Sequence, residues 1–188
     1  MPRILLALIA ISLAAPGCSD DGPLTDSGFT ANGDSFTDYV DAGGNISRPE
    51  MFREDWVHLG SWFVKQDDEA SGPGVHDVYT TRETVQAFRQ EGQWPDGAVI
   101  VKTVSGIEEK RLTTGNAQWA GEIGVWFVMV RDRKNRFPDN KAWGEGWGWA
   151  LFEADDPDKN LTSNWRGKGF NNCFGCHAPA KDTEWVYI

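Results

Sequence analysis

Two cysteines and a histidine stand together near the C-terminus, in the segment Cys173-Phe174-Gly175-Cys176-His177. Two thiols at this spacing can add across the two vinyl groups on one edge of a porphyrin, and the adjacent histidine can then reach the iron. Cys-x-x-Cys-His is therefore the attachment sequence of c-type haem. It predicts one covalent haem c, bound through Cys173 and Cys176, with His177 as the proximal metal ligand.

Two other kinds of site use similar residues. A thioredoxin-like redox pair is typical of a βαβ setting with the cysteines at a helix N-terminus, and the sequence indicates neither. A zinc site needs further ligands, and the only other histidines are His58 and His76. The third cysteine, Cys18, is far away in the sequence, so the odd cysteine count indicates no disulfide framework.

The position of the motif restricts the kind of cytochrome. Eleven residues follow His177, and none is methionine or histidine, which excludes the small electron-transfer cytochromes with an early motif and a late methionine ligand. Met129 lies in a strand-like run typical of a core, and His58 lies in another such run, on the face of Trp62. His76 lies in a glycine-rich loop and could be a ligand or a packed residue. We therefore predict five-coordinate iron with an open distal side, which suits a gas or a substrate.

The first residues resemble a bacterial export signal. Arg3 precedes an apolar run over 4–15 that is too short to span a bilayer, and Ala-Pro-Gly leads into Cys18. This pattern predicts a signal peptide over 1–18 and lipidation of Cys18, which would place the protein in the periplasm or at the cell surface on a lipid anchor. Ordinary cleavage to a free periplasmic protein is the alternative. Residues 19–46 hold six aspartates and no lysine or arginine, which predicts an acidic disordered tether.

Residues 47–188 are predicted to form one haem domain. Thr81 and Gly92 can cap a helix between them, and a second short helix is predicted over 49–54. Aromatic and β-branched stretches predict strands over 56–65, 98–104, 122–131 and 147–153. The predicted fold class is α+β, with a mainly antiparallel β-sheet, a few short helices and a C-terminal segment that carries the haem motif. The formal net charge of −10 argues against nucleic acid as a partner, because phosphate binding needs a basic surface.

Several stretches within residues 51–188 resemble the cytochrome P-460 and cytochrome c′-beta family. They are 52–60, 96–102, 145–152, and the haem motif with Lys181-Asp182-Thr183 after it. The resemblance implies a β-rich fold, usually a homodimer, in which a C-terminal segment holds haem against the sheet. It implies one of two activities, because P-460 members oxidise hydroxylamine whereas c′-beta members bind nitric oxide and related gases in an apolar pocket.

Two further residues become informative through this resemblance. Lys102 matches a lysine that P-460 members bond to a meso carbon of the haem. Alternation along a strand places Lys102 on the inward face with Ala98, where burial favours the neutral amine; the alternative is a stem on the sheet with its tip in water. Glu145 matches the distal-pocket glutamate of the hydroxylamine oxidisers. Alternation groups Glu145 with Trp147 and Trp149, where it could relay protons; the alternative is a solvated loop carboxylate.

Three functional hypotheses follow. In the first, the protein oxidises hydroxylamine, Glu145 accepts protons, Lys102 modifies the macrocycle, and electrons pass to a small c-type cytochrome. In the second, it captures nitric oxide without turnover. In the third, it carries electrons and uses His58 or His76 as a sixth iron ligand. The presence of both Lys102 and Glu145 favours the first.

Overall fold

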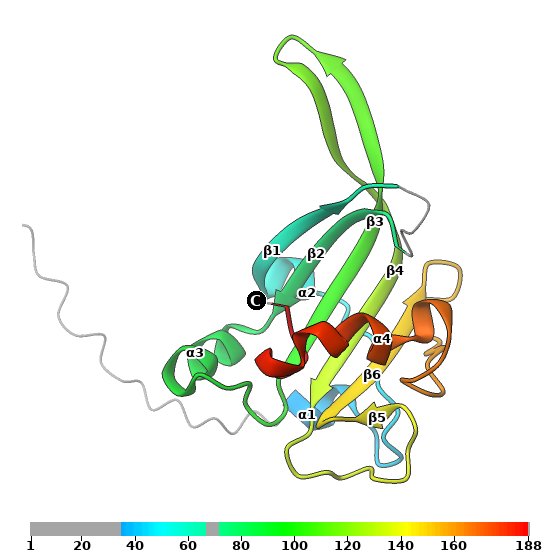
Figure 1. Ribbon diagram of the computed structural model, residues 1–188. Helices are drawn as coiled ribbons and strands as arrows, with labels where there is room; N and C mark the ends of the chain where they lie inside the picture. Colours follow the sequence, from blue (N-terminus) through cyan, green and yellow to red (C-terminus); the bar gives the residue numbers. More distant parts are fainter. Residues whose placement is uncertain (1–34, 67–71, 188) are drawn as a thin grey trace, which may run out of the picture. The chain divides into compact units, whose positions relative to one another are not determined.

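A six-stranded antiparallel sheet forms the centre of the computed structural model, which describes residues 35–66 and 72–187 (Figure 1). The strand order is β1-β2-β3-β4-β6-β5, so most strands pair with their neighbours along the chain. The strands are β1 (Val57–Val64), β2 (Gly74–Thr80), β3 (Val99–Leu112), β4 (Gly115–Arg131), β5 (Trp143–Gly144) and β6 (Trp147–Glu153). The predicted α+β class with a mainly antiparallel sheet is confirmed.

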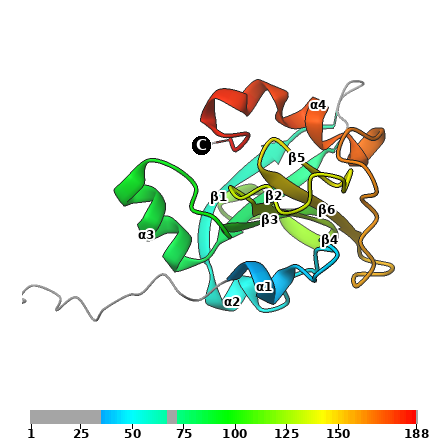
Figure 2. The ribbon, with the colours of Figure 1, turned by 90° about the horizontal axis from the view of Figure 1, so that it is seen from below.

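Short helices cover both faces of the sheet. Figure 2 shows α1 and α2 below the sheet and the C-terminal segment with α4 above it. The helices are α1 (Ser35–Tyr39), α2 (Phe52–Asp55), α3 (Arg82–Glu91) and α4 (Cys173–His177), and two 3₁₀ turns are η1 (Gly169–Asn171) and η2 (Ala178–Thr183). No helix in the described part of the chain is both long and apolar enough to cross a membrane.

The ends of α3 follow the prediction closely. The Thr81 hydroxyl accepts a hydrogen bond from the backbone N–H of Thr84 at 3.1 Å, which satisfies one of the free amides at the helix start. Gly92 ends the helix in the left-handed conformation, with φ at 68°, and its N–H donates to the carbonyl of Phe88.

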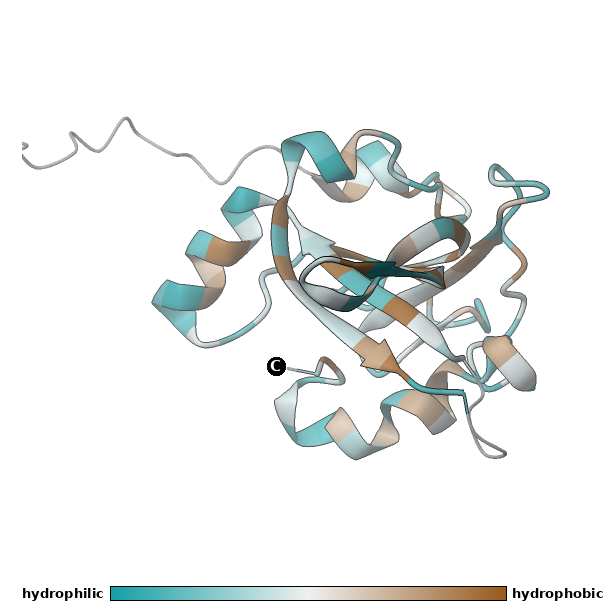
Figure 3. Cartoon of the chain, turned by 90° about the horizontal axis from the view of Figure 1, so that it is seen from above, coloured by the Kyte–Doolittle hydropathy of each residue, from teal (hydrophilic) through white to brown (hydrophobic). Residues whose placement is uncertain are grey.

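Alternation along the strands divides the apolar residues between two layers. Val99 and Val101 of β3 join a core with α1 and α2, whereas Ile100 packs on the opposite face, toward the C-terminal segment. Figure 3 shows apolar residues along the strands that lie between these helical layers. Both faces of the sheet are therefore covered at its centre. A bound group could lie between the second face and the C-terminal segment.

The predicted tether over 19–46 is wrong for its last twelve residues. Phe36, Val40 and Ile46 have exposed fractions of 4%, 6% and 4% and belong to the core beside β3 and β4. The Asp41 carboxylate caps the intervening turn by accepting hydrogen bonds from the backbone of Gly43 and Asn45. The acidic composition of this segment therefore gave no indication of its three widely spaced, buried apolar side chains. The rest of the predicted tether and the signal peptide with Cys18 lie outside the described residues.

Removal of residues 35–46 is expected to destabilise the domain. A chain that begins at Ser47 loses Phe36, Val40 and Ile46, and each such buried side chain contributes about 1.5–3 kcal/mol. Urea unfolding should therefore show a markedly lower midpoint for this chain than for one that begins at Gly33, with both exported by the same foreign signal. Equal midpoints would contradict the assignment of this segment to the core.

Two features of the sheet differ from the sequence prediction. His76, predicted to lie in a glycine-rich loop, belongs instead to the strand β2 and therefore has a fixed direction. A register shift between His58 and Gly60 turns His58 to the opposite face from Trp62, so that His58 pairs with Tyr79 while Trp62 pairs with His76. The predicted common face of His58 and Trp62 is therefore wrong.

Candidate functional site

The Cys-x-x-Cys-His motif forms the single helix α4 under a side-chain cap. The Asn172 side chain accepts a hydrogen bond from the backbone N–H of Gly175 at 2.9 Å. Both thiols are free; Cys173 is buried and Cys176 is exposed. Burial raises the pKa of Cys173 to about 11. A redox-active cysteine pair requires a lowered thiol pKa, so this environment argues against the thioredoxin-like alternative.

His177 is held in the state that a metal ligand requires. Its Nδ1–H donates to the backbone carbonyl of Trp185 at 2.7 Å, which leaves the lone pair on Nε2. Burial lowers the pKa of His177 to about 4, so the imidazole is neutral at pH 7. Its ring also meets Trp149 of β6 edge-on, with 4.9 Å between the ring centroids. Backbone and packing together fix the direction of the ligand nitrogen.

A cavity of about 510 Å³ separates the C-terminal segment from the second face of the sheet. Its size lies in the range of cofactor pockets. The two thiols and His177 form one wall of it. The other lining residues are mostly apolar: Trp62, Val64, Gly72, His76, Val78, Ile100, Lys102, Val104, Phe127, Val128, Met129, Trp149, Ala150, Gly169, Phe170, Asn172, Val186 and Tyr187.

Lys102 projects from β3 into this cavity, on the face predicted from alternation. Its strand neighbours Ile100 and Val104 also line the cavity, and its Nζ lies 4.3 Å from the ring centroid of Phe127. The side chain is only partly buried by area because its remaining surface faces the cavity. Burial nonetheless lowers the pKa of Lys102, which favours the neutral amine. The alternative, in which Lys102 is an ammonium with its tip in water, does not fit this position.

Glu145 lies elsewhere. It occupies the turn between β5 and β6 with φ at 56°, and its side chain is 45% exposed. Its carboxylate is 3.7 Å from the Arg166 guanidinium and does not line the cavity. The predicted alternation with Trp147 and Trp149 is wrong because the strand begins only at Trp147. The structure therefore does not bring Glu145 together with Lys102 and the haem motif.

Of the remaining candidate iron ligands, two line the cavity and two do not. His76 of β2 and Met129 of β4 line the cavity, and Met129 is buried in its floor. His58 is exposed on the other face, where its Nε2 lies 3.0 Å from the Ser61 hydroxyl. Met51 is exposed and is not among the lining residues. No group of three or more histidine, cysteine, aspartate or glutamate side chains in the described residues could hold a metal ion.

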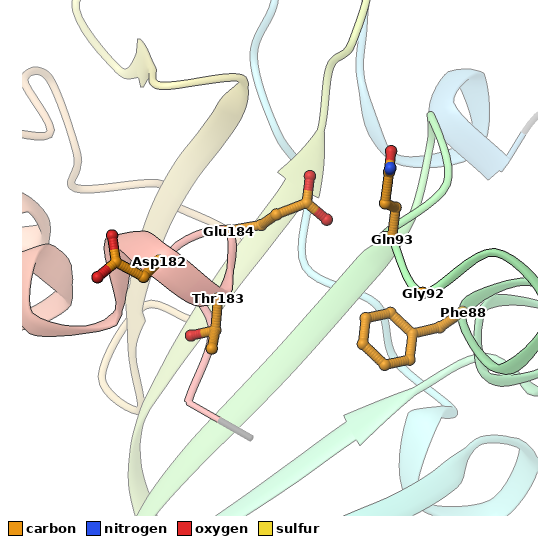
Figure 4. A pocket seen from close by; sticks show the side chains of 6 residues that line it. All are labelled: Phe88, Gly92, Gln93, Asp182, Thr183 and Glu184. Atoms are coloured by element: carbon orange, nitrogen blue, oxygen red, sulfur yellow. The ribbon is translucent and has the colours of Figure 1, made fainter.

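A second, smaller cavity of about 410 Å³ lies between the end of α3 and η2. Figure 4 shows Asp182, Thr183 and Glu184 on one side of it and Phe88, Gly92 and Gln93 on the other. Glu184 bonds Arg131 of β4 at 2.6 Å and accepts from the backbone N–H of Trp94 at 2.9 Å. This cavity has no thiol or imidazole, and its glutamate fastens the motif-bearing segment to the sheet.

Comparison with known families agrees with this geometry. A family model described as cytochrome P460 matches residues 49–188, which is most of the chain. The chain belongs to the cytochrome P460 family. Comparison with curated proteins gives no match. The family implies a haem cofactor and a small-molecule substrate, and the site fits such a group: two thiols, a neutral imidazole nitrogen and a largely apolar cavity meet at one place.

Sequence reasoning on this cytochrome P460 chain missed the place of His76 in the cavity. The signal was present, since residues 75–80 are rich in β-branched and aromatic types. The glycines at 72 and 74 outweighed it. Gly74 is required there, because a side chain at this position would collide with the backbone carbonyl of Ser105.

Proposed function

We propose that this cytochrome P460 protein holds haem covalently through Cys173 and Cys176, with His177 as proximal ligand, and oxidises hydroxylamine. The observation that carries the proposal is the position of Lys102, whose desolvated amine projects into the cavity shared by the two thiols and His177. A lysine so placed is required for the haem cross-link of P-460 members. Electrons would leave to a small c-type cytochrome.

The residues that line the cavity have separate roles in the proposed function. Haem, when bound, would supply an iron centre that can exchange electrons with a small molecule. His177 offers Nε2 in a direction fixed by the Trp185 carbonyl. The neutral Lys102 amine keeps the lone pair that bond formation to carbon needs, which an ammonium lacks. The apolar walls, including Phe127 and Val104, exclude water around a small uncharged molecule such as hydroxylamine.

A second candidate function has an observation of its own. No aspartate or glutamate is among the described residues that line the cavity. Such a pocket suits capture of nitric oxide, which needs no proton acceptor. The third hypothesis, an electron carrier, now depends on His76 alone, since His58 lies outside the cavity.

We also propose that the protein works outside the cytoplasm as a homodimer. The support is the export-like pattern over 1–18, with Cys18 as the lipid-anchored residue of a periplasmic or surface lipoprotein. Attachment of c-type haem outside the cytoplasm agrees with this location. The homodimer comes from the family resemblance.

Two measurements on the purified holoprotein test the function. Hydroxylamine consumption with an artificial electron acceptor, together with a red-shifted Soret band in the ferrous protein, is the expected result. An ordinary high-spin c-type spectrum with tight nitric oxide binding and no consumption would identify a gas-binding protein instead. A sharp low-spin spectrum would identify an electron carrier.

A further inference from the structure

His76 stands at the far end of the cavity from His177. His177 packs on Trp149 of β6, whereas His76 belongs to β2. In the sheet these strands are separated by β3 and β4, so β6 and β2 are three strand spacings apart, about 14 Å across the sheet. The two residues are also offset along the strands, because Trp149 is in line with Ile100 and His76 with Val104. Lys102 of β3 lies between them, since it falls between Ile100 and Val104 along the strand. One cavity thus has an imidazole at each end.

The hydrogen bonding of His76 defines which nitrogen can act. Its Nε2 lies 2.7 Å from the backbone carbonyl of Gly72, and a carbonyl can only accept, so Nε2 carries the hydrogen. In the neutral ring the lone pair is then on Nδ1. Burial lowers the pKa of His76 further below its ordinary value, so the neutral form prevails at pH 7. Trp62 and Val104, its partners across the sheet, carry no charge.

The other polar groups of the cavity are poor proton acceptors. A Lys102 amine bonded to haem has a diminished lone pair, and the Tyr187 hydroxyl already donates to the carbonyl of Cys176 at 2.5 Å. The His177 lone pair would bind the iron of the proposed haem. Glu145, assigned this task from the sequence, is outside the cavity.

We infer that His76 is the catalytic base of the cavity, accepting a proton through Nδ1 from a small nitrogenous molecule held between it and His177. The inference rests on the proposed haem site. In this step an N–H or O–H bond of the bound molecule breaks, its electron pair stays on that molecule, and the proton forms the N–H bond of an imidazolium. The step is a proton transfer only, with no oxidation or reduction. The partly exposed ring then returns the proton to water.

Two ligands of ferric haem separate base catalysis from simple access. Hydrogen cyanide is protonated at neutral pH and must lose its proton on binding, whereas azide is already an anion. In stopped-flow measurements on the holoprotein, His76→Gln should slow cyanide association about a hundredfold and leave azide association unchanged. Glutamine retains an N–H donor for the Gly72 carbonyl, so the local fold is preserved. The rate of hydroxylamine oxidation should also fall in His76→Gln.

His58→Gln is the matched control, because His58 is a histidine of the neighbouring strand that does not line the cavity. It should leave both rates unchanged. Equal rates for wild type and His76→Gln with cyanide would overturn the inference. A low-spin ferric spectrum that becomes high-spin in His76→Gln would overturn it too, since His76 would then be an iron ligand. If His76→Gln slows cyanide association but the wild type does not oxidise hydroxylamine, His76 is a base and only the proposed reaction fails.

Discussion

Replacement of both Cys173 and Cys176 by alanine is expected to yield a protein that releases all of its haem into acid–acetone, whereas the wild type should release none. Two thioether bonds survive denaturation, and a coordinate bond from His177 does not. Cys173 is buried and Cys176 is exposed, yet both line the cavity beside His177. Each single alanine variant should therefore still retain haem through one bond. The haem content of the precipitated protein measures the outcome.

Cys18→Ser provides the matched control for this experiment. It removes the third cysteine, which the sequence assigns to lipidation, and should leave haem retention unchanged while freeing the protein from membranes. Extraction of haem from the wild-type protein by acid–acetone would contradict covalent attachment and leave only a haem held by coordination.

Loss of the Lys102 amine is expected to abolish hydroxylamine oxidation and to restore an ordinary c-type spectrum. Lys102→Met retains an apolar stem of similar length over Phe127 and removes only the nucleophile. The cross-link would distort the macrocycle and so tune the iron, and without it that influence disappears. Peptide mass spectrometry should find the wild-type Lys102 peptide joined through haem to the peptide of Cys173 and Cys176, and should find no such species in the variant.

Lys110→Met is the control on the same strand, because Lys110 is exposed and far along β3 from the cavity. It should leave both spectrum and turnover unchanged. A free Lys102 in the mature wild-type holoprotein would remove the oxidase proposal and favour the gas-binding function. A cross-link without hydroxylamine consumption would mean that the cofactor is as proposed and the reaction is not.

Local chemistry explains why much of the site was predictable. The spacing from Cys173 to His177 is a covalent requirement that does not depend on the fold. The direction of Lys102 needed only the two-residue period of a strand, and the structure confirms the inward face. The helix between Thr81 and Gly92 likewise carries its end signals within its own sequence.

Other features depended on contacts that composition does not reveal. Residues 35–46 fold because three apolar side chains find a distant core, although their neighbours are acidic. The direction of His58 depends on a bulge in β1, which reverses the alternation from that point. Glu145 was misplaced because a turn with positive φ interrupts the alternation before β6. The same extrapolation was correct for Lys102, where the strand is uninterrupted.

The hairpin formed by the distal parts of β3 and β4 makes the stability of the sheet uneven. Beyond Ser105, where pairing with β2 ends, these strands pair only with each other among the described strands, and Figure 1 shows them projecting from the sheet. Trp119 and Leu112 near its end are exposed. A two-stranded ribbon is only marginally stable in water, so this ribbon should open and close as a separate cooperative unit. Because Val99–Val104 and their partners remain packed in six strands, such opening leaves the walls of the cavity closed.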